Sequence, residues 1–127
     1  MTTYRNEYGQ LHRTDGPAVV TAWGDQGWWL NGDLHRVGGP ARVWANGDQA
    51  WYQNGKLHRA DGPAITHKTG LREWWLKGKR HRTDGPAVIY DNGTPEWWFE
   101  GKPIDQLTHM LLVNQHNIQT QPQMAVL

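Results

Sequence analysis

Residues 74–86 read Trp-Trp-Leu-Lys-Gly-Lys-Arg-His-Arg-Thr-Asp-Gly-Pro: two adjacent tryptophans, a glycine turn, and a segment rich in Arg, His, Gly and Pro. This stretch recurs along the chain, because His12, His35, His58 and His81 follow one another at intervals of 23 residues without an insertion. A fixed period of this length predicts a repeat architecture, in which each unit packs on its neighbours.

The period divides most of the chain into four units. Their bounds are 11–33, 34–56, 57–79 and 80–102, after a degenerate N-terminal part-repeat at 1–10. Every unit contains His-Arg, Gly-Pro-Ala, a central glycine, an aromatic pair and a late glycine. The aromatic pairs are Trp28-Trp29, Trp51-Tyr52, Trp74-Trp75 and Trp97-Trp98.

Two turns divide each unit into short segments that are rich in Val, Ile, Trp and Thr. Asn46-Gly47 marks the central turn and Asn54-Gly55 the late turn, and Asn-Gly favours a two-residue type I′ hairpin. Glycine recurs too often for helices, whereas β-branched and aromatic residues favour strands. The sequence therefore predicts an all-β fold: an antiparallel meander of about eight strands built from repeated β-hairpins, single-layered and curved like a solenoid.

The chain changes character after the fourth unit, and residues 103–127 are expected to form a C-terminal helix and tail. Apolar residues at helical spacing predict a short capping helix over 104–115, with Asp105 as its N-cap. Such a helix would cover the open end of the repeats. Residues 119–127 are expected to be mobile or to form an interaction tail.

The string Trp-Leu-Lys-Gly-Lys-Arg-His at 75–81 resembles the MORN repeat, and more closely the MORN-variant repeats of bacterial and phage proteins. The resemblance covers residues 11–102. It departs from typical MORN units after the histidine, where this chain reads Arg-x-Asp-Gly-Pro-Ala rather than Gly-x-Gly. The resemblance implies curved arrays of hairpins that act as protein-interaction or assembly modules. Phospholipid binding is also proposed for the family, but the small net charge of this chain gives it little support.

The turns also predict which side chains share a face. A two-residue late turn pairs Gln53 with Lys56, Tyr52 with Leu57 and Trp51 with His58. A two-residue central turn places Trp74 opposite Ile65 and Trp75 opposite Ala64. The expected core face then carries the second aromatic, the leucines, the alanines, Val20 and Ile89. The other face carries the first aromatic, the histidines and a variable column, which consists of Val19, Arg42, Ile65 and Val88.

An arginine follows each histidine, and the same count places these arginines on the core face. Each is expected to form an ion pair with the aspartate two residues on, which would hold the Asp-Gly-Pro segment in a bulge. Arg36 should lack this pair because Gly38 replaces the aspartate. Glu73 should lie opposite Arg82.

Composition excludes several classes of function. The chain has neither Cys nor Ser, so thiolate metal sites, disulfides and Ser or Cys nucleophiles are absent. The net charge of +1 favours neither nucleic acid nor membrane. With no signal peptide and no apolar run of membrane-spanning length, a cytoplasmic protein is expected. Equivalent histidines should lie roughly 10 Å apart, too far to share one zinc ion, so neither metal nor cofactor is expected.

The second unit differs most from the others, and differences between repeats are where function is expected. Arginine and aromatic residues there are typical interface anchors. The candidate partner-binding residues are Arg36, Arg42, Trp44, Trp51, Gln53, His58 and His67. All except Arg36, which the count places on the core face, are expected to share the other face. We expect a non-catalytic scaffold that binds a partner protein or self-associates. The alternative is a phage-type binder that sequesters a nucleotide or another small defence-signalling ligand, since stacked aromatics with arginine also suit nucleotides.

Overall fold

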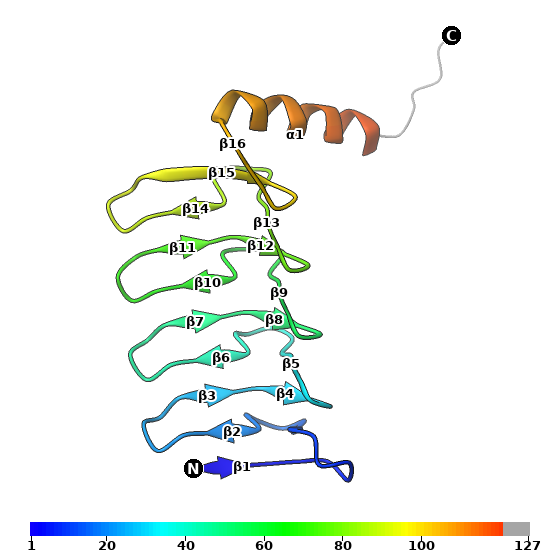
Figure 1. Cartoon of the computed structure of the whole chain (residues 1–127), viewed down its shortest axis with the longest axis vertical. Helices are drawn as coiled ribbons and strands as arrows, with labels where there is room; N and C mark the ends of the chain where they lie inside the picture. The colour runs from blue at the N-terminus through cyan, green and yellow to red at the C-terminus, as the bar shows by residue number, and fades with distance from the viewer. Residues whose placement is uncertain (121–127) are drawn as a thin grey trace.

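The repeats form one long antiparallel sheet whose strands stack along the long axis of the molecule, with a single helix at one end (Figure 1). The structure is a computed structural model that describes residues 1–120. In spatial order the sheet contains β1 (Thr2–Thr3), β2 (Val19–Val20), β3 (Gln26–Gly27), β6 (Arg42–Val43), β7 (Gln49–Ala50), β10 (Ile65–Thr66), β11 (Arg72–Glu73), β14 (Val88–Ile89), β15 (Pro95–Phe99) and β16 (Lys102–Ile104). Because β1 and β16 lie at opposite ends, the sheet is open, and the expected meander of hairpins is confirmed.

Three further hairpins flank the sheet at the late turns. They are β4 (Trp29–Leu30) with β5 (Asp33–Leu34), β8 (Tyr52–Gln53) with β9 (Lys56–Leu57), and β12 (Trp75–Leu76) with β13 (Lys79–Arg80). Trp28 separates β3 from β4, and its N–H donates to the carbonyl of Ala41 in the next unit at 2.7 Å. The segment that contains β3 and β4 therefore pairs through β3 with β6 of the sheet and through β4 with β5 across the late turn. The following units repeat this arrangement.

The late turn has the predicted register. Tyr52 pairs with Leu57 and Gln53 with Lys56. Asn54 and Gly55 both have positive φ, at 51° and 79°, as a two-residue type I′ turn requires. The prediction from Asn-Gly is confirmed here.

The central turn is one residue longer than predicted, and the predicted register is wrong. Arg42 pairs with Ala50, so the loop consists of three residues, 45–47. The N–H of Asp48 donates to Oδ1 of Asn46 in an Asx turn, and only Gly47, at φ 101°, has positive φ. This arrangement matches a three-residue loop with a glycine bulge rather than a type I′ turn. Ile65 accordingly pairs with Glu73 instead of Trp74.

A slip of one residue moves a column of side chains to the opposite face of a sheet. The variable column pairs with Gly27, Ala50, Glu73 and Glu96, each two residues before a second aromatic. It therefore shares the face of Trp29, Tyr52, Trp75 and Trp98, which we call the second-aromatic face. The opposite face carries Trp28, Trp51, Trp74 and Trp97 and is called the first-aromatic face. The alanine column and Val20 and Ile89 belong to the first-aromatic face, contrary to the prediction.

The interior is made of small side chains rather than large ones. The alanines after the Gly-Pro step are completely buried; they are Ala18, Ala41, Ala64 and Ala87. Ala50 and Val88 are 2% exposed, whereas the tryptophans of the aromatic pairs are only partly buried. Much aromatic surface therefore remains accessible along both faces.

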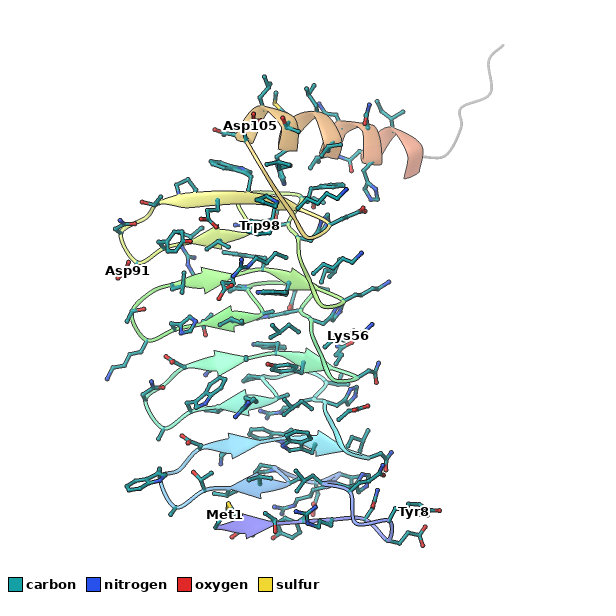
Figure 2. All side chains as sticks on the ribbon, viewed as in Figure 1. Met1, Tyr8, Lys56, Asp91, Trp98 and Asp105 are labelled. Atoms are coloured by element: carbon teal, nitrogen blue, oxygen red, sulfur yellow. The ribbon has the colours of Figure 1, made fainter. Side chains whose placement is uncertain are left out.

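The helix α1 (Gln106–Thr120) covers the C-terminal end of the sheet, as predicted, although it begins and ends later than 104–115. Asp105 is its N-cap, since its Oδ1 accepts the N–H of Thr108 at 2.6 Å, and Figure 2 shows Asp105 at the start of the helix. His109 is 4% exposed, and its ring packs edge-on against Phe99 of β15. Gln119 and Thr120 belong to the helix, and the rest of the predicted tail, 121–127, lies outside the described residues.

Candidate binding surface

The seven predicted site residues do not share one face. Arg42 and Trp44 lie on the second-aromatic face, where the guanidinium of Arg42 stands 4.8 Å from the Trp44 ring. His67 also lies there, beside Asp48 at 3.5 Å. Trp51, Gln53 and His58 belong to the first-aromatic face, because they follow the late-turn register. Arg36 also lies there, because its guanidinium stacks on Trp28. The register slip in the central turn separates the two groups.

The arginine that follows each histidine stacks on a first-face aromatic ring, not on the core face as predicted. Each guanidinium carbon lies about 4 Å from a ring centroid: Arg13 over Tyr4, Arg36 over Trp28, Arg59 over Trp51 and Arg82 over Trp74. The strand ends before the arginine, for example at Leu34 before Arg36, so the alternation of side chains does not continue. Trp74 is therefore covered by an arginine of its own chain.

Two further contacts hold each arginine in place. In the third unit, Nη1 of Arg59 donates to the carbonyl oxygen of Pro63 at 3.2 Å. A Cβ placed on Gly62 would lie 2.9 Å from Cζ of Arg59, so glycine is needed for the guanidinium to pack there. Equivalent contacts occur in all four units. The shared Arg, Gly and Pro are thus parts of one bracket that builds the scaffold.

The predicted ion pairs are confirmed in three units. Nε of Arg13, Arg59 and Arg82 donates to Asp15, Asp61 and Asp84 at 2.8–3.0 Å. These hydrogen bonds hold the pKa of the three carboxyl groups below the usual range.

The second unit is different. Gly38 stands at the aspartate position with φ 80°, and no carboxylate among the described residues bonds to Arg36. The Nε of Arg36 therefore lacks the carboxylate partner that its equivalents have in the other units.

Each histidine of the repeated column makes a hydrogen bond to the backbone of a late turn. Nδ1 of His58 accepts the N–H of Lys77 in the next late turn at 3.0 Å, and His12, His35 and His81 make the equivalent contact. Burial lowers the pKa of His81. Within the described residues, no group of His, Asp or Glu is arranged to hold a metal ion.

Clefts open on the first-aromatic face between the brackets of successive units. The first, with a volume of about 600 Å³, is lined by Trp28 and Leu30 between Arg13 and Arg36. The third, of about 450 Å³, is lined by the equivalent Trp74 and Leu76. The position between them carries the predicted residues of this face: Arg36, Trp51, Gln53 and His58, together with Arg59. The predicted set therefore belongs to a row of equivalent positions.

Sequence reasoning missed the other lining residues of this row. Leu30 and Leu76 precede the late turn, and Val37, which lines the first cleft, is 78% exposed. The confirmed late-turn pairing already places Leu30 and Leu76 on the first-aromatic face. Leu30, for example, pairs with Asp33 and follows Trp29, so its side chain points to the face opposite that of Trp29. That pairing was the signal that could have identified them.

The second-aromatic face carries a different set of contacts. Arg42 and Trp44 line a groove of about 250 Å³ together with Trp29. Further along, Glu73 is 8% exposed and accepts hydrogen bonds from Arg80, not from Arg82 as predicted. Much of the polar surface there is therefore occupied by internal contacts.

No family model matches the chain, and searches of curated proteins and of solved structures likewise find no match. Over the described residues, no helix has the length and apolar character needed to cross a bilayer.

Proposed function

We propose that this protein is a non-catalytic, MORN-like repeat scaffold that binds a segment of a partner protein in the clefts of its first-aromatic face. The observation that carries the proposal is the Nε of Arg36, which has no carboxylate partner among the described residues, beside a cleft lined by Trp28 and Leu30. In the other units the same nitrogen bonds to an aspartate of the chain itself. A ligand carboxylate would replace that aspartate.

The size and composition of the clefts support a peptide ligand. Their volumes, about 450 and 600 Å³, fall within the usual range for ligand sites. Tryptophan and arginine are the residues that most often dominate binding at protein interfaces. The bracket fixes their positions before binding, so little ordering entropy is lost when the partner docks.

A random-peptide display selection on the immobilised protein tests this function. Bound peptides are then compared on Gly38→Asp, which puts a carboxylate at the sequence position of the other aspartates, and on Gly38→Asn. The asparagine has the same size without the charge and the same backbone strain at φ 80°. We expect at least tenfold weaker binding to Gly38→Asp than to Gly38→Asn. Equal binding to both variants, or selection of no peptide that depends on this face, would refute the proposal.

A second copy of the chain is the other candidate occupant of these clefts. Sedimentation of the wild type over a range of concentrations separates the two cases. A monomer at all concentrations favours a foreign partner, whereas dimerisation that Gly38→Asp abolishes identifies the partner as another copy.

A nucleotide-like ligand is the second candidate function, and the pair formed by Arg42 and Trp44 favours it. Stacked aromatics beside arginine suit bases, although the groove of about 250 Å³ is small for a nucleotide. A bound ligand stabilises the folded state, so a thermal-shift screen with nucleotides tests this candidate. A shift that Trp44→Ala removes would support it, and no shift across the panel would exclude it.

A further inference from the structure

The first and third clefts of the first-aromatic face lie at equivalent positions two repeats apart, and Trp51 and Gln53 occupy the equivalent position between them. Equivalent strands such as β2, β6 and β10 are two positions apart in the sheet. With neighbouring strands about 4.8 Å apart, equivalent points therefore recur about every 9.6 Å. A ligand that occupies several clefts must present similar side chains on one side with this period.

Of the regular peptide conformations, polyproline II matches this period best. It has three residues per turn and rises about 3.1 Å per residue, so every third side chain faces the same side after about 9.3 Å. In a β-strand every second side chain points to the same side, so equivalent side chains lie about 6.6 or 13.2 Å apart. An α-helix returns to the same side after seven residues, or about 10.5 Å, a mismatch about three times larger.

The chemistry of the clefts agrees with this geometry. Trp28 and Leu30 in the first cleft, and Trp74 and Leu76 in the third, offer aromatic and aliphatic surface. Aromatic-lined grooves are a common recognition surface for proline-rich polyproline II segments. Arg36 lines the first cleft, and its Nε has no carboxylate partner within the described part of the chain.

We propose that the partner segment is a polyproline II helix with proline or another apolar residue at every third position and one acidic side chain opposite Arg36. This inference rests on the proposed peptide-binding function and specifies its ligand. The segment runs along the stack of repeats, so that successive apolar residues contact the equivalent positions of Trp28, Trp51 and Trp74. Its carboxylate accepts the hydrogen bond that Asp15, Asp61 and Asp84 accept in the other units.

Three synthetic peptides of about 12 residues test the inference, a length that spans the positions of Trp28, Trp51 and Trp74 in polyproline II. The first repeats Leu-Pro-Pro with one central Glu. The second has the same composition with Leu at every second position. The third is an Ala-rich helix with Leu at every seventh position and the same Glu. We expect the first to bind at least tenfold more tightly than either control.

Isotope-labelled protein shows by NMR where each peptide binds. The indole N–H signals of Trp28, Trp51 and Trp74 should shift, whereas those of Trp29 and of Trp23, which is 83% exposed, should not. If either control peptide binds as tightly as the first, the polyproline II inference is wrong. If the display-selected peptides still shift the same three signals, the proposed function survives that failure. If no peptide shifts them, both proposals are wrong.

Discussion

Replacing the bracket arginine in the third unit should destabilise the repeats substantially. Arg59→Met keeps an aliphatic chain over Trp51 but removes the charge and every hydrogen-bond donor. Two main contributions are lost. The charged hydrogen bond to Pro63 contributes about 1.5–3 kcal/mol, and the stacking of the guanidinium 3.9 Å above the ring contributes about 0.5–1 kcal/mol. The expected loss is therefore about 2–4 kcal/mol.

The ion pair with Asp61 should contribute little to this loss, because that carboxylate side chain is 81% exposed and screened by water. The second unit provides the control, since Arg36 makes the same stacking and proline contacts without a carboxylate. Arg36→Met should therefore cost nearly as much as Arg59→Met. Asp61→Asn should change stability only slightly.

Hydrogen exchange is the suitable assay, because repeat arrays can unfold locally and a single global transition is not assured. The N–H of Trp51 bonds to the carbonyl of Ala64, within the segment that Arg59 holds. Its protection should fall in Arg59→Met by the amount given above. A loss below about 1 kcal/mol, or a loss in Arg36→Met that is far smaller than in Arg59→Met, would refute the role assigned to the bracket.

Three other substitutions test separate parts of the fold. Burial lowers the pKa of His81 below its ordinary 6.5, so the unfolded chain binds the proton more readily than the folded chain. The free energy of unfolding should therefore fall as the pH drops below 6.5. Urea titrations at several pH values should show a weaker pH dependence in His81→Gln, and an unchanged dependence would contradict this role. Gly62→Ala should destabilise the wild type by about 1 kcal/mol and cost clearly less in the Arg59→Met background, which lacks the guanidinium carbon nearest to the added methyl group; a double-mutant cycle measures this difference. Asp105→Ala should reduce the helical circular dichroism signal, which Asp105→Asn retains because asparagine is an equally good N-cap; equal signals would contradict the capping role.

The repeat, its late turn and its helix could be predicted from the sequence because each depends on local chemistry. Asn54-Gly55 adopts the positive φ values of a type I′ turn, and this fixes the pairing of Tyr52 with Leu57. Asp105 precedes apolar residues at helical spacing and caps the helix. The absence of a carboxylate at Gly38 was also visible, because the other units provide the comparison within the same chain.

The assignment of faces could not be predicted, because the same dipeptide forms two different turns. Asn46-Gly47 resembles Asn54-Gly55 in sequence, yet the Asn46 side chain accepts the N–H of Asp48 and the loop gains one residue. Hairpin pattern alone does not reveal that Asx contact, although one residue decides which face Arg42 occupies. The sequence therefore predicts all of the site residues except Arg36 on one surface, whereas the structure divides them between two.

The arginine column illustrates a second limit. Period-two alternation applies only while the chain remains a strand, and β5 ends at Leu34. Arg36 then reaches Trp28 on the other face and packs on Gly39. Gly39 is needed because the Arg36 guanidinium packs against it across the loop. Residue propensities do not describe a contact of this kind.

A carboxylate of the bound segment at Arg36 is the central element of the proposed interface, and one thermodynamic cycle tests it most directly. The dissociation constants of the strongest acidic display-selected peptide and of its Glu→Gln counterpart are measured on wild type and on Gly38→Asp. We expect the glutamate to strengthen binding to the wild type by about 1.5–3 kcal/mol and to provide no advantage on Gly38→Asp. An equal effect of the glutamate on both proteins would show that Arg36 does not receive the ligand carboxylate.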